Sequence, residues 1–164
     1  MSKKGFTLIE LLAVIVILAI ILLIAMPIVL NVINEARRGA FDSTAYGIVK
    51  TAENQYMRSA LDGETERTWY EFTTVDNVTT QTVYRCTDAA CATTTAAPTA
   101  EKLEFTGRAP TSGTVYVNND GEIALFLTDG TWCSTKALDA TTVLTPDPAA
   151  PDPCTLAAAV RPEL

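Results

Sequence analysis

The stretch that decides the fold of this chain is FTLIELLAVIVILAIILLIAMPIVL, residues 6–30. Residues 11–30 contain no charge, and twenty residues of α-helix extend about 30 Å, which matches the hydrocarbon thickness of a bilayer. Glu10 lies at the leading edge of this run, and Lys3 and Lys4 precede it. Basic residues before a membrane segment tend to stay in the cytoplasm, so we expect the rest of the chain on the outer side.

A cleaved secretory signal is the main alternative for this segment, since two lysines precede an apolar core. Three features disfavour it. The core exceeds the usual length of about 7–15 residues, no small-x-small cleavage site follows it, and Glu10 lies inside its leading edge. The sequence therefore predicts an apolar helix that stays in the mature protein.

The helical pattern continues past the apolar run. Apolar residues recur at helical spacing through residues 31–61, at Ile33, Ala36, Ala40, Phe41, Ile48, Val49, Ala52, Tyr56 and Ala60. Asp62 and Gly63 then provide a C-terminal cap. We predict one helix over about residues 6–61, membrane-spanning in its first half and amphipathic in its second. Pro27 removes one backbone hydrogen bond inside this helix, and we expect a kink there.

The second half of the chain changes to short runs that are rich in β-branched and aromatic residues and are separated by turn residues. These runs predict strands at residues 68–74, 82–86, 102–106, 114–118 and 122–128, followed by TWCST. The residues Asn-Asp-Gly at 119–121 predict a tight hairpin. We expect an antiparallel sheet of three to five strands covered by the helix, with surface loops at residues 87–100 and 146–153.

The composition disfavours catalysis and nucleic-acid binding. The net charge is −7, an acidic balance that repels phosphate backbones. The chain has no histidine, which removes the commonest general base and metal ligand at neutral pH. We therefore expect no enzymatic activity, no cofactor, no metal site and no nucleic-acid partner.

Four cysteines lie in the part assigned to the outside: Cys86, Cys91, Cys133 and Cys154. Their spacing lacks the paired short intervals of a zinc ribbon, so disulfides are the better interpretation. Of the three possible pairings we favour Cys86–Cys91, which closes a loop around one turn, and Cys133–Cys154, which fastens the proline-rich tail to the last strand. The crossed pairings stay open.

The N-terminal residues KKGFTLIELLAVIVILAIILLIAMP resemble the N-terminal signature of type IV pilins and their pseudopilin relatives. In that signature a short basic leader ends in glycine, and an aromatic residue and a carboxylate follow at fixed spacing before an apolar helix. The resemblance implies that residues 1–5 are a class III leader, that a prepilin peptidase cuts between Gly5 and Phe6, and that it methylates the new amine of Phe6. Pro27 stands where the family usually has a proline.

Glu10 requires a partner, because an acidic residue inside a membrane costs about 2.5–3.5 kcal/mol at mid-bilayer and less near the interface. Cleavage would create a positive amine at Phe6. In a bundle of parallel, offset helices, Glu10 of one subunit can meet the Phe6 amine of the next, a charge pair that penalises wrong registers. The alternative is that Glu10 lies at the headgroup interface and caps its own helix.

The resemblance implies a structural subunit of a type IV pilus: a single-pass membrane protein before assembly, then part of an extracellular filament on the bacterial surface used for adhesion, motility or aggregation. Its partners would be other copies of itself in a helical homopolymer, the prepilin peptidase, the membrane before assembly, and an assembly platform with its ATPase. A minor pilin or pseudopilin of a type II secretion or DNA-uptake system is one alternative. A membrane-anchored binding module that never polymerises is the other.

The expected fold is α+β, with a long N-terminal helix packed on a small antiparallel β-sheet and a cysteine-bounded C-terminal segment. Its predicted parts are the leader at residues 1–5, the transmembrane and filament-core half of the helix at 6–30, the amphipathic half at 31–62, and a globular β-sheet domain with a C-terminal loop region at 63–164.

Overall fold

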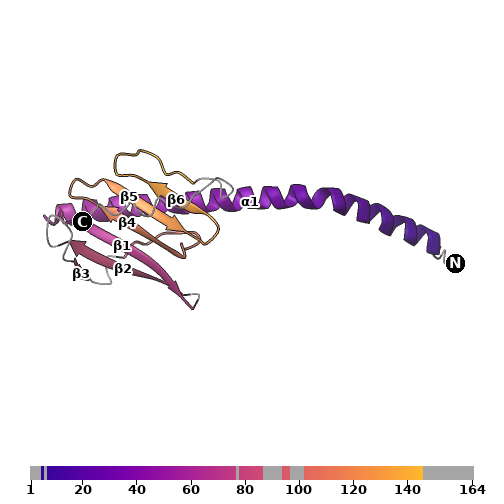
Figure 1. Cartoon of the computed structure of the whole chain (residues 1–164), viewed down its shortest axis with the longest axis horizontal. Coiled ribbons are helices and arrows are strands. Elements are labelled where there is room, and N and C mark those ends of the chain that lie inside the picture. The colour runs from indigo at the N-terminus through magenta and orange to yellow at the C-terminus, as the bar shows by residue number, and fades with distance from the viewer. Residues whose placement is uncertain (1–4, 6, 77, 87–93, 97–101, 146–164) are drawn as a thin grey trace. The chain divides into compact units, whose positions relative to one another are not determined.

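A computed structural model of the chain describes residues 5, 7–76, 78–86, 94–96 and 102–145. It consists of one long helix, α1, followed by the strands of one sheet (Figure 1). The chain divides into two compact units, Met1–Arg37 and Arg38–Leu164. The fold is α+β, as predicted, with a long N-terminal helix and a small antiparallel sheet packed on its second half.

Helix α1 (Leu8–Leu61) ends at a local signal in the sequence. The amide of Glu64 donates to the carbonyl of Ser59 at 2.8 Å. The amide of Gly63 donates to the carbonyl of Ala60 at 3.1 Å, and Gly63 has a φ of 82°, in the left-handed region that favours glycine. These two bonds form a Schellman motif, which confirms the predicted helix end.

In the unit Met1–Arg37, large apolar side chains of α1 are exposed. Leu22 is 65 % exposed and Leu23 is 79 % exposed. By its length and composition α1 is able to cross a membrane. Pro27 lies inside α1, which continues on both sides of it, and the kink expected there stays a prediction. Side chains of this kind need lipid or other apolar surfaces around them.

In the unit Arg38–Leu164, α1 runs along the sheet (Figure 1), and one stripe of its side chains packs against the strands. The buried apolar residues of the helix follow the i, i+4, i+7, i+8, i+11 spacing of one helix face, at Phe41, Ala45, Ile48, Val49 and Ala52. They share one core cluster with residues of the strands, among them Phe72, Val115 and Leu125. Burial of this apolar surface is the main favourable contribution to the stability of the unit.

The sheet has six strands among the described residues, in the order β3-β2-β1-β4-β5-β6, and all neighbouring strands are antiparallel. The strands are β1 (Thr68–Val75), β2 (Val78–Cys86), β3 (Thr94–Ala96), β4 (Ser112–Val117), β5 (Ile123–Thr128) and β6 (Cys133–Lys136). The pairing of β1 with β4 joins the hairpin β1–β2 to the meander β4–β5–β6. The described strands therefore form one continuous sheet.

The strand predicted at residues 102–106 was wrong. These residues form no strand, although Leu103 is only 4 % exposed and belongs to the core. The hydroxyl of Thr51 on α1 donates to the carbonyl of Glu104 at 2.9 Å. A helix side chain therefore holds this backbone where a strand partner was expected, and the apolar pattern indicated burial without indicating a strand.

The loop predicted at residues 87–100 contains a strand, β3, which pairs with β2 at Tyr84 and Arg85. Pairing at a sheet edge uses backbone groups and requires no apolar side chains, so a sequence rich in threonine and alanine carries little signal for it. The other residues of this loop, and the loop predicted at 146–153, lie outside the described residues. With β3 the sheet exceeds the predicted three to five strands.

The hairpin predicted at residues 119–121 joins β4 to β5, as expected. The side-chain oxygen of Asn118 accepts a hydrogen bond from the amide of Glu122 at 2.8 Å, which closes the turn. The hydroxyl of Tyr56 on α1 donates to the carbonyl of Asn119 at 2.7 Å. The turn is therefore fastened to the helix as well as to itself.

A short strap, residues 143–145, follows β6 and returns to the helix. The guanidinium of Arg38 donates twice to the carbonyl of Thr145, at 3.0 Å from Nε and at 2.5 Å from Nη2. The hydroxyl of Thr145 donates to Asp42 at 2.8 Å. These charge-assisted contacts tie the end of the described chain to α1.

Candidate functional site

The N-terminus of α1 is built from Thr7 and Glu10. The amide and the hydroxyl of Thr7 both donate to Oε2 of Glu10, each at 2.8 Å. In return, the amide of Glu10 donates to the hydroxyl of Thr7 at 3.3 Å. This reciprocal arrangement is a capping box, which satisfies two backbone amides that a helix start otherwise leaves without partners.

The capping box gives Glu10 a local role that the charge-pair interpretation alone did not include. A carboxylate is also stabilised by the positive end of the helix dipole. Within the described part of the chain, the other carboxylate oxygen, Oε1, makes no hydrogen bond or ion pair. One oxygen of Glu10 is thus used within its own chain, and the other is open to a partner.

Sequence reasoning missed Thr7, although the signal was present. Thr7-Leu8-Ile9-Glu10 has the Thr-x-x-Glu spacing of a capping box directly before an apolar helix. The hydrogen bonds between Thr7 and Glu10 show that Glu10 caps its own helix, as the alternative interpretation expects. The predicted pair with the Phe6 amine of a neighbouring subunit stays a prediction.

The predicted cleavage point lies just before this cap. Gly5 is exposed, and a Cβ built on it would meet no atom within 4 Å. Packing within the chain therefore does not require glycine at this position. Phe6, the predicted new N-terminus and methylation site, lies outside the described residues, and cleavage between the two stays a prediction.

The cysteines belong to the unit Arg38–Leu164. Cys86 is 6 % exposed and Cys133 is 1 % exposed, and neither of these two described cysteines is a free thiol. Cys91 and Cys154 lie outside the described residues. The pairings Cys86–Cys91 and Cys133–Cys154, and with them the cysteine-bounded C-terminal segment, stay predictions.

Comparison with known proteins gives a family match at this same end of the chain. Residues 1–26 match the family model described as the prokaryotic N-terminal methylation motif. No curated protein and no solved structure matches the chain significantly. The motif implies processing by a prepilin peptidase and assembly into filaments in general, and it supports a type IV pilin-like or pseudopilin function. Together with the capped apolar helix, this match supports a type IV pilin-like prepilin with a class III leader.

Proposed function

We propose that this protein is the structural subunit of a type IV pilus, cleaved after Gly5, methylated at Phe6 and polymerised through its N-terminal helix into a filament on the bacterial surface. The filament serves adhesion, motility or aggregation. The observation that carries the proposal is the methylation motif at residues 1–26, placed at the start of a helix whose apolar side chains are exposed.

The exposed apolar side chains of the helix explain why such a subunit needs an apolar environment both in the membrane and in the filament. Between Leu8 and Leu30 the large apolar side chains have few contacts within the chain. A bilayer covers them before assembly, and the helices of other copies cover them in a filament. Lipid tails are as apolar as leucine, so moving from lipid to protein contacts yields little hydrophobic free energy. Packing and polar contacts must then select the assembled state, and external work must extract the subunit.

In this proposal, Glu10 is the residue whose polar contact selects the assembled state. Its Oε2 is held by Thr7, which fixes the direction of the carboxylate at the helix start. The free Oε1 accepts from the methylated Phe6 amine of the next copy. A charge-assisted hydrogen bond of this kind is about twice as strong as a neutral one, and a wrong register leaves both charges without a partner in a dry core.

Processing is tested on fibres sheared from cells, by the intact mass and the N-terminal sequence of their subunit. We expect a chain that starts at Phe6 and carries one added methyl group. A minor pilin or pseudopilin would show the same processing but would be a trace component of long fibres. An intact Met1, or recovery only from the membrane fraction, would refute the proposal in favour of a membrane-anchored binding module.

The role of Glu10 is tested with three variants that separate its charge from its capping function. Glu10→Ala removes both, Glu10→Gln removes the charge but retains an acceptor that suits a capping box, and Thr7→Val removes the capping hydroxyl. We expect both Glu10 variants to be cleaved but to form few fibres, and Thr7→Val to lose less. Normal fibres from Glu10→Gln would refute the charge pair and leave helix capping as the role of Glu10.

A further inference from the structure

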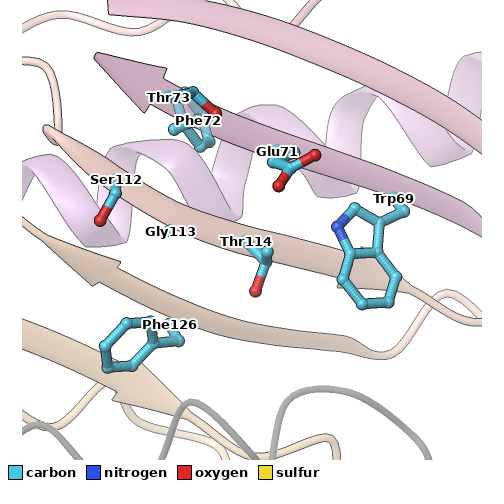
Figure 2. A pocket seen from close by; sticks show the side chains of 8 residues that line it. All are labelled: Trp69, Glu71, Phe72, Thr73, Ser112, Gly113, Thr114 and Phe126. Carbon is cyan, nitrogen blue, oxygen red and sulfur yellow. The ribbon is translucent and has the colours of Figure 1, made fainter. Parts of the chain in front are cut away.

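The face of the sheet that is turned away from α1 carries a hollow of about 260 Å³ (Figure 2). Successive residues of a strand point to opposite faces. On β1, Tyr70 and Phe72 are buried in the core, while Trp69, Glu71 and Thr73 alternate with them. The hollow is lined by Trp69, Glu71, Phe72, Thr73, Ser112, Gly113, Thr114 and Phe126, which come from β1, β4 and β5.

Strand register places three of the lining residues in one row across the sheet. Glu71 is directly opposite Thr114, and Thr114 is directly opposite Phe126. The floor requires glycine at position 113, because a Cβ there would clash with the carbonyl oxygen of Phe126. The hollow is thus a built feature of three adjacent strands and does not depend on a loop.

Two aromatic rings lie at opposite ends of the hollow, as Figure 2 shows for Trp69 and Phe126. Both are partly buried and pack against the small apolar cluster that contains Tyr116. The ring of Trp69 meets that of Tyr116 edge to face, with centroids 6.2 Å apart and an interplanar angle of 69°. This contact fixes the orientation of the indole.

Four polar side chains also line the hollow: Glu71, Thr73, Ser112 and Thr114. In the described part of the chain, the carboxylate of Glu71 and these three hydroxyl groups make no hydrogen bond or ion pair. A carboxylate is an acceptor, and each hydroxyl both donates and accepts. The hollow therefore offers several polar partners that the protein itself does not use.

We propose that this hollow binds a neutral sugar ring of a glycan. A sugar ring has apolar C–H faces that suit an aromatic side chain, and a rim of hydroxyl groups that suits a carboxylate and short hydroxyl side chains. The volume is below the range of about 300–1,000 Å³ typical of drug-sized ligands, which fits one ring. Glu71 and a net charge of −7 disfavour phosphorylated, sulfated and carboxylated sugars.

The assay uses the full chain in a zwitterionic detergent, because detergents with sugar headgroups would compete. The probes are the methyl glycosides of glucose, galactose, mannose, N-acetylglucosamine and N-acetylgalactosamine, read by saturation-transfer NMR and by tryptophan fluorescence. We expect at least one to bind with a Kd of about 1 mM, the affinity that a ligand of this size reaches with a few contacts. Binding does not require polymerisation, so the result is independent of the proposed pilus function.

Two conservative variants and one matched control assign the site. Glu71→Gln replaces a charged acceptor of the sugar by a weaker neutral one, and Thr114→Val removes a hydroxyl partner, so each should weaken binding about tenfold. Thr82→Val makes the same change on the neighbouring strand, at the residue opposite Glu71 but outside the lining, and should bind normally. Unchanged thermal unfolding shows that each variant is folded.

Three outcomes overturn the proposal. The first is that none of the five glycosides shows saturation transfer. The second is that the Thr114→Val variant binds a glycoside as tightly as the unmodified chain. The third is that the chain binds sialic acid or a sugar phosphate more tightly than every neutral sugar. Binding that is weakened by Thr114→Val and retained by Thr82→Val supports it.

Discussion

Replacing Ile48 by alanine tests how the globular unit is held together. Ile48 lies on α1 in the stripe that faces the sheet, and it is 0 % exposed. Ile21 on the same helix is 55 % exposed, and Ile21→Ala is the matched control. Both substitutions remove the same atoms from an isoleucine of α1. Ile48 loses them from a packed core, and Ile21 loses them from an exposed surface.

The magnitude follows from burial. Each buried methylene is worth about 0.8 kcal/mol, so the three carbon atoms lost from Ile48 are worth about 2.5 kcal/mol in transfer free energy. A cavity that the surroundings fill only in part raises the cost to about 3–4 kcal/mol. Since domains are stable by about 5–15 kcal/mol, this is a large share of the free energy of unfolding. Ile21→Ala should change that free energy by less than about 0.5 kcal/mol.

Urea unfolding of the full chain in detergent micelles, followed by tryptophan fluorescence, measures the difference. Both tryptophans of the chain, Trp69 and Trp132, belong to the unit Arg38–Leu164, so the signal reports on that unit. A loss below about 1 kcal/mol for Ile48→Ala would refute the reasoning, since such small values are typical of surface positions. Equal losses for Ile48→Ala and Ile21→Ala would refute it as well.

Three further predictions concern contacts of the sheet. Tyr56→Phe removes the hydrogen bond of 2.7 Å to the carbonyl of Asn119 and should lower the free energy of unfolding by about 1 kcal/mol in the same urea assay; an unchanged midpoint would contradict it. Burial raises the pKa of Tyr116, so its contribution to stability is fully present below the unfolded pKa of about 10 and is lost as the pH rises through the folded pKa. Tyr116→Phe should therefore flatten the alkaline loss of stability, and parallel stability curves against pH would contradict this. A non-reducing peptide digest should contain Cys133 joined to Cys154, and reduction should lower stability by about 2–4 kcal/mol; a digest that joins either residue to another cysteine would show the crossed pairing.

The parts of the fold that could be predicted are those that depend on neighbours along the chain. The end of α1 follows from Gly63, which adopts a positive φ at the Schellman motif. The hairpin at residues 119–121 and the buried stripe through Ile48 follow from turn residues and helical spacing. The role of Thr7 belongs to the same class, because a Thr-x-x-Glu capping box is a pattern of near neighbours in the sequence.

The parts that could not be predicted depend on partners distant in sequence. Leu103 is buried beside α1 without belonging to a strand, because the backbone next to it bonds to Thr51, which is far away along the chain. Strand β3 is paired with β2 through the backbone, and the sequence Thr-Thr-Ala carries little apolar signal. No local pattern distinguishes these outcomes from an ordinary strand or an ordinary loop.

The sequence by itself determined that this protein starts with a methylation motif and an apolar helix, because spacing along one segment is sufficient for both. Only the tertiary structure decided which strands are neighbours. The pairing of β1 with β4, and of β4 with β5, brings Trp69, Glu71, Thr114 and Phe126 to one hollow. Such a site exists only after non-local pairing, since its residues are spread over three strands and share no motif.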